Sequence, residues 1–558
     1  MAADSQTSPD FDAVVIGAGF AGLGMLRQLR EELSMSVQVY EAGSGVGGTW
    51  YWNRYPGARC DSESYVYCFS FSKELLQDWN WSGKYPEQPE ILSYLNHVAD
   101  RFDLRRNIQF DTRVTSAKFI EDTNYWLIET DQGDRVTARY LITGIGCIST
   151  GNVPDIPGLD SFEGVWHHTG SWPHEEVDFV GKRVAVIGTG SSGVQAIPVI
   201  ASQAKRLTVF QRTPQYTIPA HHETVDRRFI EEDVKPNYDE IWEKARWSKS
   251  GFPVEFSQRS ALEVSAEERL ATYEAHWAKG GFGFLHGTFA DIRTDIRAND
   301  TVAEFIRSKI REIVYDPETV EKLLPTDHPY GSKRALIDTN YFETYNRENV
   351  ELVDIRHSPI QEITPKGIRT EDEEFEFDII VFATGYDAMT GSFLKMDIRG
   401  RNGLPLKEKW SEGPKTYLGL QVAGFPNMFM ITGPGSPSVL CNMPVAIEQH
   451  IEWISGFIEF LREREIETAE ADLESESAWV SHVNEVAEPT MFMLADSWYL
   501  GANIPGKPRV FMPYAGGLGT YREKCHEVAD NGYEGFILDC HSTSTKDGGE
   551  PWQDRVQA

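Results

Sequence analysis

A buried apolar run opens the patterned part of the chain. Phe11–Ile16 reads as a buried strand, and it leads directly into Gly17, Gly19 and Gly22 in the spacing G-x-G-x-x-G. In such a loop the first glycine allows a tight turn, the second lets the backbone approach a pyrophosphate, and the third lets a helix pack closely on the strand. We expect that helix over about Leu23–Leu33, with its N-terminal amides facing the phosphates.

The next apolar run, Ser36–Tyr40, ends at an acid, Glu41. In dinucleotide-binding folds an acid at this point accepts hydrogen bonds from ribose hydroxyls. A lone G-x-G-x-x-G is weak evidence. Strand, glycines, helix and acid in this order, however, predict a dinucleotide site.

The same pattern returns further along the chain. The apolar run Arg183–Ile187 is followed by Gly188, Gly190 and Gly193 in the same spacing, and we expect the next helix to begin near Val194. The chain therefore contains a second dinucleotide-binding unit.

The two units differ where their second strands end. The strand Leu207–Phe210 of the second unit is followed by Arg212, at the position that Glu41 holds in the first. A carboxylate would repel the 2′-phosphate of NADP(H), whereas a guanidinium can bind it with two hydrogen bonds. We therefore predict NADP(H) rather than NAD(H) for the second unit. The alternative is that Arg212 is a surface residue without a ligand.

Outside the two units the pattern changes several times. Residues 90–104 have helical spacing, and 107–142 read as a β-rich meander. Residues 222–325 are charged, aromatic and helical in pattern, which indicates an insertion. Strand patterns return at 328–355 and at 375–388, where the second stretch reads as a crossover. Together these patterns predict an α/β fold with two Rossmann-like domains and a helical insertion in the second.

Composition excludes several classes of protein. The 558 residues suffice for two or three domains, and a hydrophobic content of 41% is typical of globular chains. The formal net charge of −32 should repel nucleic acids and anionic membranes. We find no secretory signal, no apolar run long enough to span a bilayer and no cluster with metal-ligand spacing.

The cysteines indicate a reducing compartment. None of them forms a C-x-x-C pair, which favours free thiols in a cytoplasmic protein and weighs against a disulfide-reductase flavoenzyme. They are Cys60, Cys68, Cys147, Cys441, Cys525 and Cys540.

A short aromatic stretch, FEGVWHHTGSWP, lies just before the second unit. Its fixed positions are Phe162, Gly164, His168, Trp172 and Pro173, and in this spacing they resemble the fingerprint of the Baeyer–Villiger monooxygenases. These flavoenzymes insert an oxygen atom beside a ketone carbonyl. The alternative is an aromatic linker in which His168 is a hydrogen-bonded structural residue. We expect His168 to set the geometry between the domains without contacting substrate.

The resemblance to this family covers nearly the whole chain. It rests further on the segments NRYPGARCD, VIGTGSSG, FQRTPQY, YGSKR, ITGPGSPSVLCNM and SWYLGANIPGKPRVF. It implies tightly held FAD, with NADPH and O2 as co-substrates. The implied reaction converts ketones to esters or lactones through a flavin peroxide, with sulfoxidation as a side activity.

The resemblance also implies roles for individual residues. Arg334 would be the cation that keeps the peroxide anionic and stabilises the developing oxyanion, and Asp61 would orient it. Lys333 would share the 2′-phosphate with Arg212, and Trp498 would bind the nicotinamide ribose. All five positions lie within the segments quoted above.

The remaining expected contacts follow from the glycine loops and from the resemblance. For FAD, besides the glycines, Glu41 and Asp61, they are Phe20, Gly48, Thr49, Trp50, Tyr67, Val114 and Met443. For NADP(H), besides the glycines, Arg212, Lys333, Arg334 and Trp498, they are Thr189, Ser191, Ser192, Gln195 and Thr213. For the substrate pocket they are Ser438, Val439, Leu440 and Met443.

Two departures from the family pattern stand at the first crossover. Gly144-Ile145-Gly146 replaces the usual ATG-type triplet, and Cys147 falls where relatives carry a polar amide. A thiol is a weak hydrogen-bond donor, so hydrogen bonding on the flavin side is in doubt there.

These patterns divide the chain into six parts. We expect an FAD-binding domain at 11–145 and 384–540, an NADP-binding domain at 146–221 and 328–383, a helical insertion at 222–327 and a disordered tail at 541–558. We expect a small ketone and O2 as the reactants, no nucleic-acid or membrane partner, and a monomer or a weak homo-oligomer.

Two other functions remain open at this stage. A flavin N- or S-oxygenase uses a similar frame but would not need Arg334, and its fingerprint would lack the Trp-Pro pair. An NADPH:flavin electron-transfer or redox-sensing protein would reduce its flavin without oxygenating a substrate.

Overall fold

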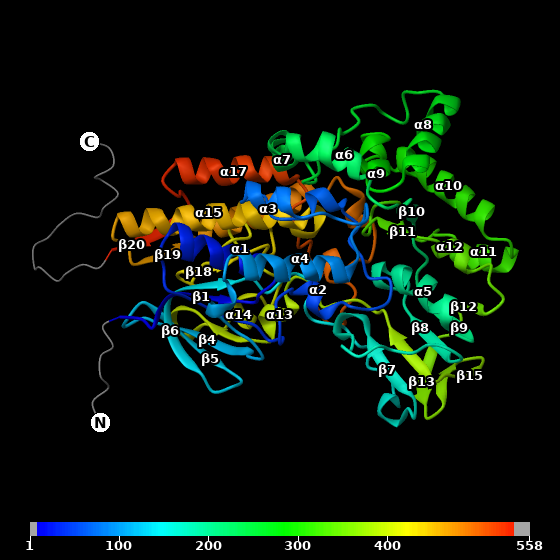
Figure 1. Cartoon of the computed structure of the whole chain (residues 1–558), viewed down its shortest axis with the longest axis horizontal. Helices are drawn as coiled ribbons and strands as arrows, with labels where there is room; N and C mark the ends of the chain where they lie inside the picture. The colour runs from blue at the N-terminus through cyan, green and yellow to red at the C-terminus, as the bar shows by residue number, and fades with distance from the viewer. Residues whose placement is uncertain (1–7, 541–558) are drawn as a thin grey trace, which may run out of the picture.

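The protein is built around two mainly parallel sheets, one in each half of the molecule (Figure 1). The structure is a computed structural model that describes residues 8–540. The tail for which the sequence predicts disorder, 541–558, lies outside the described residues.

The first sheet has eight strands in the order β17-β4-β5-β6-β1-β2-β3, with β18 also paired to β6. Its parallel centre carries the first glycine loop, and the antiparallel strands β4–β6 form the meander. The late strands β17 and β18 join a sheet that the N-terminal part of the chain began. The strands are β1 (Phe11–Ile16), β2 (Val37–Tyr40), β3 (Ile108–Gln109), β4 (Val114–Ile120), β5 (Tyr125–Thr130), β6 (Arg135–Thr143), β17 (Asp397–Arg399) and β18 (Met428–Met430).

Helices cover this sheet, and the buried faces of α1 and α15 share one apolar core (Figure 1). Helix α15 is long and nearly all buried over its first four turns. It begins at Met443, the last residue of the predicted substrate loop, Ser438–Met443. The helices of this half are α1 (Phe20–Arg27), α2 (Thr49–Trp52), α3 (Lys73–Asp78), α4 (Gln88–Arg101), α13 (Gly391–Leu394), α14 (Leu406–Lys409), α15 (Met443–Glu463), α16 (Leu473–Ala487) and α17 (Leu518–Asp530).

The second sheet has five parallel strands in the order β12-β9-β8-β16-β7. The strands are β7 (Val165–His168), β8 (Arg183–Ile187), β9 (Arg206–Gln211), β12 (Val350–Asp354) and β16 (Ile379–Phe382), with helices α5 (Ser191–Gln203) and α12 (Tyr341–Thr344) beside them. There are three smaller sheets. One pairs β10 (Thr217–Pro219) with β11 (Leu336–Asp338), and another pairs β19 (Thr468–Ala471) with β20 (Phe536–Asp539). The third has the strand order β13 (Ile360–Thr364), β14 (Gly367–Thr370), β15 (Glu374–Glu376).

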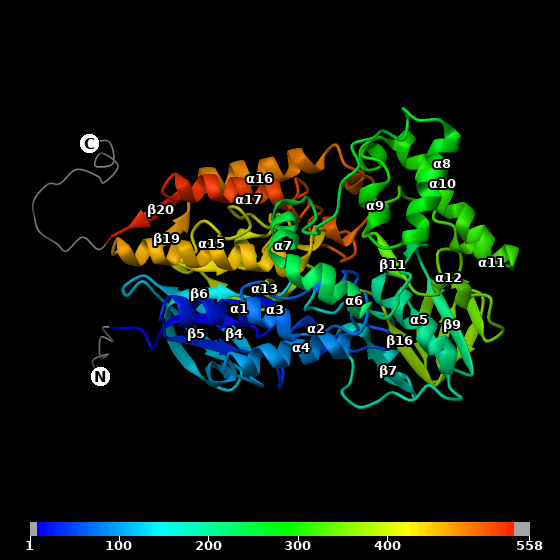
Figure 2. The same ribbon diagram turned by 45° about the horizontal axis from the view of Figure 1, so that its top comes forward.

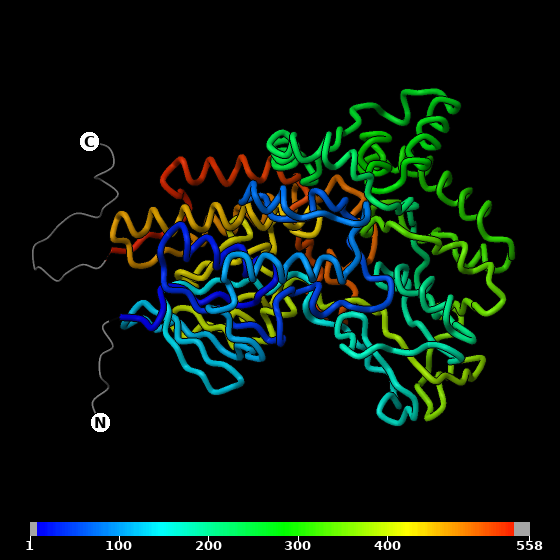
Figure 3. The backbone as a smooth tube through the Cα atoms, in the orientation of Figure 1, coloured from blue at the N-terminus to red at the C-terminus, as the bar shows by residue number. Residues whose placement is uncertain are grey.

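The segment between β10 and β11 is helical, as its pattern predicts. Its helices are α6 (Arg227–Phe229), α7 (Tyr238–Trp247), α8 (Ala266–Lys279), α9 (Gly283–Gly287), α10 (Ile296–Ile313) and α11 (Pro317–Leu323). Helices α8 to α11 stand over the second half, whereas α7 reaches back and packs on α17 of the first (Figure 2). Figure 3 traces the chain as it leaves the first half after β6 and returns after β16.

Both glycine-loop helices begin earlier than the sequence predicts. Helix α1 starts at Phe20 and ends at Arg27 in a π-turn, and α5 starts at Ser191. In each, the third glycine lies inside the first turn. A Cβ added to Gly22 would lie 1.7 Å from the Gly17 carbonyl oxygen, and one added to Gly193 would lie 2.3 Å from the Gly188 oxygen. Only glycine allows these helices to approach their strands so closely.

Candidate active site

One large cavity lies where the two halves meet. Its volume is about 1000 Å³, and both glycine loops, the insertion and the loops around α15 contribute to its wall. The predicted residues that line it are Gly19, Phe20, Gly48, Thr49, Trp50, Asp61, Tyr67, Gly188, Thr189, Gly190, Ser191, Ser192, Gln195, Arg212, Thr213, Lys333, Arg334, Val439, Leu440, Met443 and Trp498. The predicted residues outside the lining are Gly17, Gly22, Glu41, Val114, Gly193, Ser438 and the five fingerprint positions.

The acid of the first unit is bound by the protein itself. The Oε2 atom of Glu41 accepts the backbone N–H of Ala18 at 2.7 Å, and its Oε1 accepts that of Gly43, also at 2.7 Å. The side chain is buried, and burial raises the pKa of Glu41 although these hydrogen bonds oppose the rise. Glu41 therefore ties the end of β2 to the glycine loop.

The base of the second unit has no such partner. Arg212 is exposed at the end of β9 and makes no hydrogen bond or ion pair with any of residues 8–540. Lys333 faces the same part of the cavity, and burial, with the nearby charge of Arg212, lowers the pKa of its amine despite Asp327. Two cations thus stand close together without a paired acid between them.

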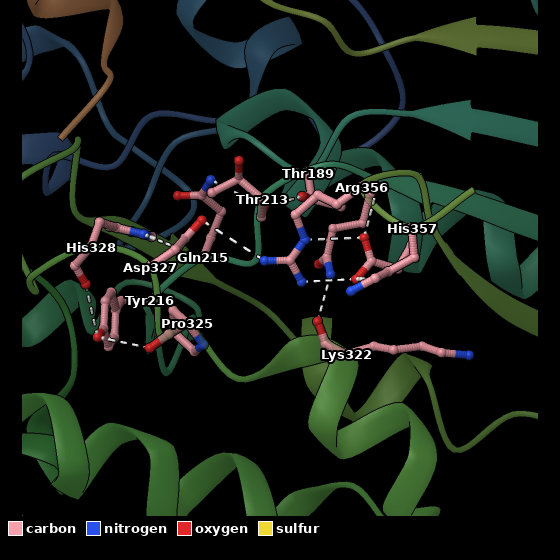
Figure 4. Close-up of polar contacts among 12 residues, drawn as sticks. Thr189, Thr213, Gln215, Tyr216, Lys322, Pro325, Asp327, His328, Arg356 and His357 are labelled. Atoms are coloured by element: carbon pink, nitrogen blue, oxygen red, sulfur yellow. Dashed lines mark hydrogen bonds and ion pairs between the residues drawn. The ribbon is translucent and has the colours of Figure 1, made fainter. Parts of the chain in front are cut away.

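The acids in this region already have partners, and Figure 4 shows the contacts of Asp327. Asp327 binds the ring of His328 at 2.6 Å, and Asp354 binds the guanidinium of Arg356 at 2.8 Å. The Thr189 hydroxyl donates to the Thr213 carbonyl at 3.0 Å, which joins the glycine loop to the end of β9. An anion such as a 2′-phosphate is the chemical group that fits the open cations.

An ion pair joins the two halves beside the cavity. Arg334 comes from the NADP half and Asp61 from the FAD half, and Nη2 of the arginine lies 2.9 Å from Oδ2 of the acid. Burial disfavours the charge, but Asp61 outweighs it, so the pKa of Arg334 is raised. A second contact, from Nη1 to the Val439 carbonyl at 3.5 Å, reaches the predicted substrate loop.

A glutamine on α5 connects the same acid to the loop around it. Gln195 accepts the Tyr55 hydroxyl at 2.8 Å and donates to the Arg59 carbonyl at 3.1 Å and to Asp61 Oδ1 at 3.4 Å. The sequence assigned Gln195 to the nucleotide and missed this bridge. Spacing within α5 carries no sign of a contact with a segment so distant along the chain.

The fingerprint forms the edge strand β7 and the turn after it, rather than a plain linker. The Nδ1 atom of His168 accepts the Gly170 N–H at 3.0 Å, so its Nε2 carries the proton and donates to the Gly385 carbonyl at 3.1 Å. Burial lowers the pKa of His168, which keeps the ring neutral. Its ring stands edge-on to Tyr386, whose hydroxyl donates to Asn53 of the FAD half. His168 therefore supports the second crossover from behind the cavity.

One residue of the predicted substrate loop does not line the cavity. Ser438 is buried, and its hydroxyl lies 2.9 Å from the Cys147 sulfur, which also contacts Thr432 at 3.5 Å. Burial raises the pKa of the Cys147 thiol. The Cys147 thiol at this departure from the family pattern lines the cavity together with Thr432, whereas Ser438 is not among the lining residues. Val439, Leu440 and Met443 line the same cavity.

The comparisons with known proteins agree with one another. Residues 14–272 match the family model described as pyridine nucleotide-disulphide oxidoreductase. A Baeyer–Villiger monooxygenase of Pseudooceanicola batsensis is 49% identical over 95% of this chain and 96% of its own. A phenazine N-monooxygenase of Lysobacter antibioticus is 47% identical over 95% and 97%. The solved structure of an oxidized steroid monooxygenase bound to NADP superposes with a TM-score of 0.91 at 52% identity, covering 95% of this chain and all of that one.

The chain belongs to the Baeyer–Villiger monooxygenases. The predicted family, the fold with two nucleotide-binding domains, the enzyme class and the cofactors FAD and NADP(H) are confirmed. The roles of the single residues and the domain boundaries remain predictions that the geometry described above supports.

The residues of this Baeyer–Villiger monooxygenase fit both cofactors. Each glycine loop brings a helix N-terminus to the cavity, Trp50 and Tyr67 offer aromatic faces in the first half, and Arg212 and Lys333 are open to an anion in the second. Within residues 8–540 no group of His, Cys, Asp and Glu could hold a metal ion. No helix in that range is long and apolar enough to cross a membrane.

Proposed function

We propose that this chain is an NADPH- and O2-dependent FAD monooxygenase that converts ketones to esters or lactones. The observation that carries this proposal is the Arg334–Asp61 pair, a fixed cation beside a cavity that joins two nucleotide-binding loops and an apolar loop. When bound, FAD supplies the redox chemistry that NADPH and O2 drive.

The protein groups divide the remaining work among them. Arg334 stabilises the negative charge that develops on the ketone oxygen, and Asp61 holds its guanidinium in place. Arg212 and Lys333 would bind the 2′-phosphate of NADPH, and Trp498 would contact its ribose. Val439 and Leu440 pack against the apolar body of the substrate.

The test is product formation by the purified holoenzyme with linear, cyclic and aryl ketones. We expect ester or lactone in step with NADPH consumption. Consumption of NADPH with hydrogen peroxide as the only oxygen product, across the whole panel, would contradict the proposal and favour an electron-transfer protein.

A second candidate is N-oxygenation, because one relative at 47% identity is a phenazine N-monooxygenase. The assay therefore includes a phenazine, a tertiary amine and an aryl sulfide beside the ketones. Sulfoxide is expected as a side product. Efficient N-oxide formation without any ester would favour the second candidate.

The location and the assembly of the enzyme also remain proposals. All six cysteines are free thiols, and five of them are buried, which supports a reducing compartment such as the cytoplasm. We propose a monomer or a weak homo-oligomer. Light scattering over a range of protein concentrations would show which.

A further inference from the structure

A third open cation lines the cavity, from the helical insertion. Arg293 is partly buried, and its guanidinium has no hydrogen-bond or ion-pair partner among residues 8–540. The acids nearest to it along the chain are used elsewhere. Asp291 accepts the Ser260 hydroxyl at 2.5 Å and the Ala261 N–H at 2.9 Å, and Asp295 pairs with Arg297 at 2.7 Å.

The surroundings of Arg293 are fixed by a buried amide. Asn299 donates to the carbonyls of Ile292 at 2.6 Å and Tyr330 at 2.8 Å. These bonds hold the turn that carries Arg293 against the start of the segment that delivers Lys333 and Arg334. The backbone at Arg293 therefore has a defined position on the cavity wall.

A buried histidine stands beside it. His286 lines the cavity, is 8% exposed and leaves its Nδ1 atom without a hydrogen-bond partner in the described part of the chain. Burial and the charge of Arg293 lower the pKa of His286 to about 3, so the ring is neutral. A buried polar atom without a protein partner is costly unless a water or a ligand group completes it, so the His286 ring can still accept a polar partner.

Aromatic rings connect this corner to the substrate loop. His286 packs on Phe256 at 4.8 Å between ring centres and on Phe282 at 6.4 Å, and Phe282 packs on Phe252 at 5.7 Å. Just before Phe252, the Ser250 carbonyl accepts the N–H of Asn442 at 2.8 Å, two residues beyond Leu440. An apolar wall thus runs from the predicted ketone site to a corner with one cation and one neutral imidazole.

We propose that Arg293 and His286 bind a carboxylate of the substrate, so that this enzyme prefers ketones that carry an acid group at the far end of an apolar body. This inference rests on the proposed ketone oxygenation. The open guanidinium supplies a charge-assisted, two-pronged contact for a carboxylate. The phenylalanine wall covers the carbon skeleton between the acid and the carbonyl. The formal net charge of −32 repels an anionic substrate, and a cation inside the cavity would offset this repulsion locally.

A phosphate of NADPH is the other anion that the cavity receives. Arg212 and Lys333 already face the end of β9 where the 2′-phosphate is expected, and the second glycine loop offers its backbone to the pyrophosphate. The rings around His286 are apolar and continue toward the substrate loop rather than toward that glycine loop. These contacts favour the substrate as the source of the anion.

The experiment compares keto acids with their methyl esters. A homologous series of straight-chain methyl-ketone acids, each with its ester, is assayed with the wild-type holoenzyme and with Arg293→Met. We expect the wild type to prefer the acid at one favoured chain length. In Arg293→Met the KM for that acid should rise by about 10- to 100-fold, with the ester unchanged.

Two variants serve as controls. Arg297→Met removes the same charge a few residues away, where the guanidinium is paired with Asp295, and should leave the preference for acids intact. Arg293→Lys keeps the charge and should restore part of the preference. Equilibrium dialysis of the favoured acid against each oxidised enzyme checks binding without turnover.

Each outcome has a distinct meaning. A wild-type enzyme that oxygenates neutral ketones but shows no preference for acids over esters overturns the carboxylate site and leaves the proposed function standing. A rise in the KM for NADPH in Arg293→Met, with the KM for keto acids unchanged, assigns Arg293 to cofactor binding. This result also overturns the carboxylate site. An enzyme that oxygenates neither acids nor neutral ketones contradicts the proposed function itself.

Discussion

Glu41 and Arg212 occupy the same position in two units of the same architecture, yet the structure uses them in opposite ways. Glu41 is buried and accepts two backbone N–H groups, whereas Arg212 is exposed and meets no partner within residues 8–540. Glu41 therefore stabilises the glycine loop itself, whereas the sequence predicted only that it would bind a ribose of the cofactor. The Arg212 side chain makes no polar contact within residues 8–540 that would stabilise the fold, which supports its proposed role in binding the 2′-phosphate.

The difference extends to the groups around each position. In the first unit, backbone N–H groups of the protein bind the Glu41 carboxylate. In the second unit, Arg212 and Lys333 have no acid bound to them within residues 8–540. Arg334 is the exception, because it comes from the second half and is held by Asp61 of the first. The position of its guanidinium therefore depends on both halves.

The largest effect should follow from replacing Arg334. Arg334→Met should lower ester formation per NADPH consumed by about two to three orders of magnitude, because one preorganised charge at the reacting oxygen is lost. Hydrogen peroxide should appear in place of ester, and the reduction of FAD by NADPH should persist. Arg334→Lys keeps the charge but cannot contact Asp61 and the Val439 carbonyl through two nitrogens, so its coupling should fall between that of the wild type and that of Arg334→Met. Near wild-type coupling in Arg334→Met would falsify the role assigned to this residue.

The acid of the first unit should matter for stability. In Glu41→Met two buried N–H donors lose their acceptor at about 1–3 kcal/mol each, offset in part because a buried charge also disappears. We expect a net loss of about 2 kcal/mol, measured on the apoprotein by urea or thermal unfolding. Arg212→Met is the matched variant and should leave the stability of the apoprotein unchanged. Equal losses in the two variants would remove the contrast between the units.

The base of the second unit should matter for cofactor choice. Arg212→Ala should raise the KM for NADPH by about 10-fold or more, since a charge-assisted contact with the 2′-phosphate is lost, and should change that for NADH little. Arg206→Ala is a suitable control, because Arg206 lies on the same strand and pairs with Glu351 outside the cavity. A parallel rise for both cofactors would show that Arg212 does not read the 2′-phosphate.

Local pattern predicted much of this molecule. The two strand–glycine–helix units, the helical insertion and the return to the first sheet all follow from apolar periodicity and glycine spacing, which act over a few residues. The helix starts were misplaced because the third glycine was read as preceding the helix, although it lies inside the first turn.

The sequence did not predict the contacts between segments that are distant along the chain. Such contacts depend on how separate elements pack together. Examples are the hydrogen bond between Gln195 and Tyr55, the contact of Ser438 with Cys147, and the place of Arg293 beside His286. No periodicity records such contacts. The motifs indicated that Asp61 and Arg334 belong together only through the resemblance to a family, and the structure supplies the distance between them.

The last expected effect is on the pH dependence of stability, and it concerns a second buried acid of the first half. Glu448, on α15, accepts the N–H groups of Ser70 at 2.7 Å and Phe71 at 3.1 Å, and burial raises its pKa from 4.5 to about 7. A raised pKa means that the folded protein keeps a proton which the unfolded chain releases. The stability from this group is therefore complete below about pH 4.5 and is lost as the pH rises to about 7. Glu448→Gln should remove this loss, so the Tm of the wild type should fall by a few degrees relative to the variant between those pH values. Parallel Tm profiles for the two proteins would show that Glu448 is ionised in the folded state, held by its two amides as Glu41 is by its own.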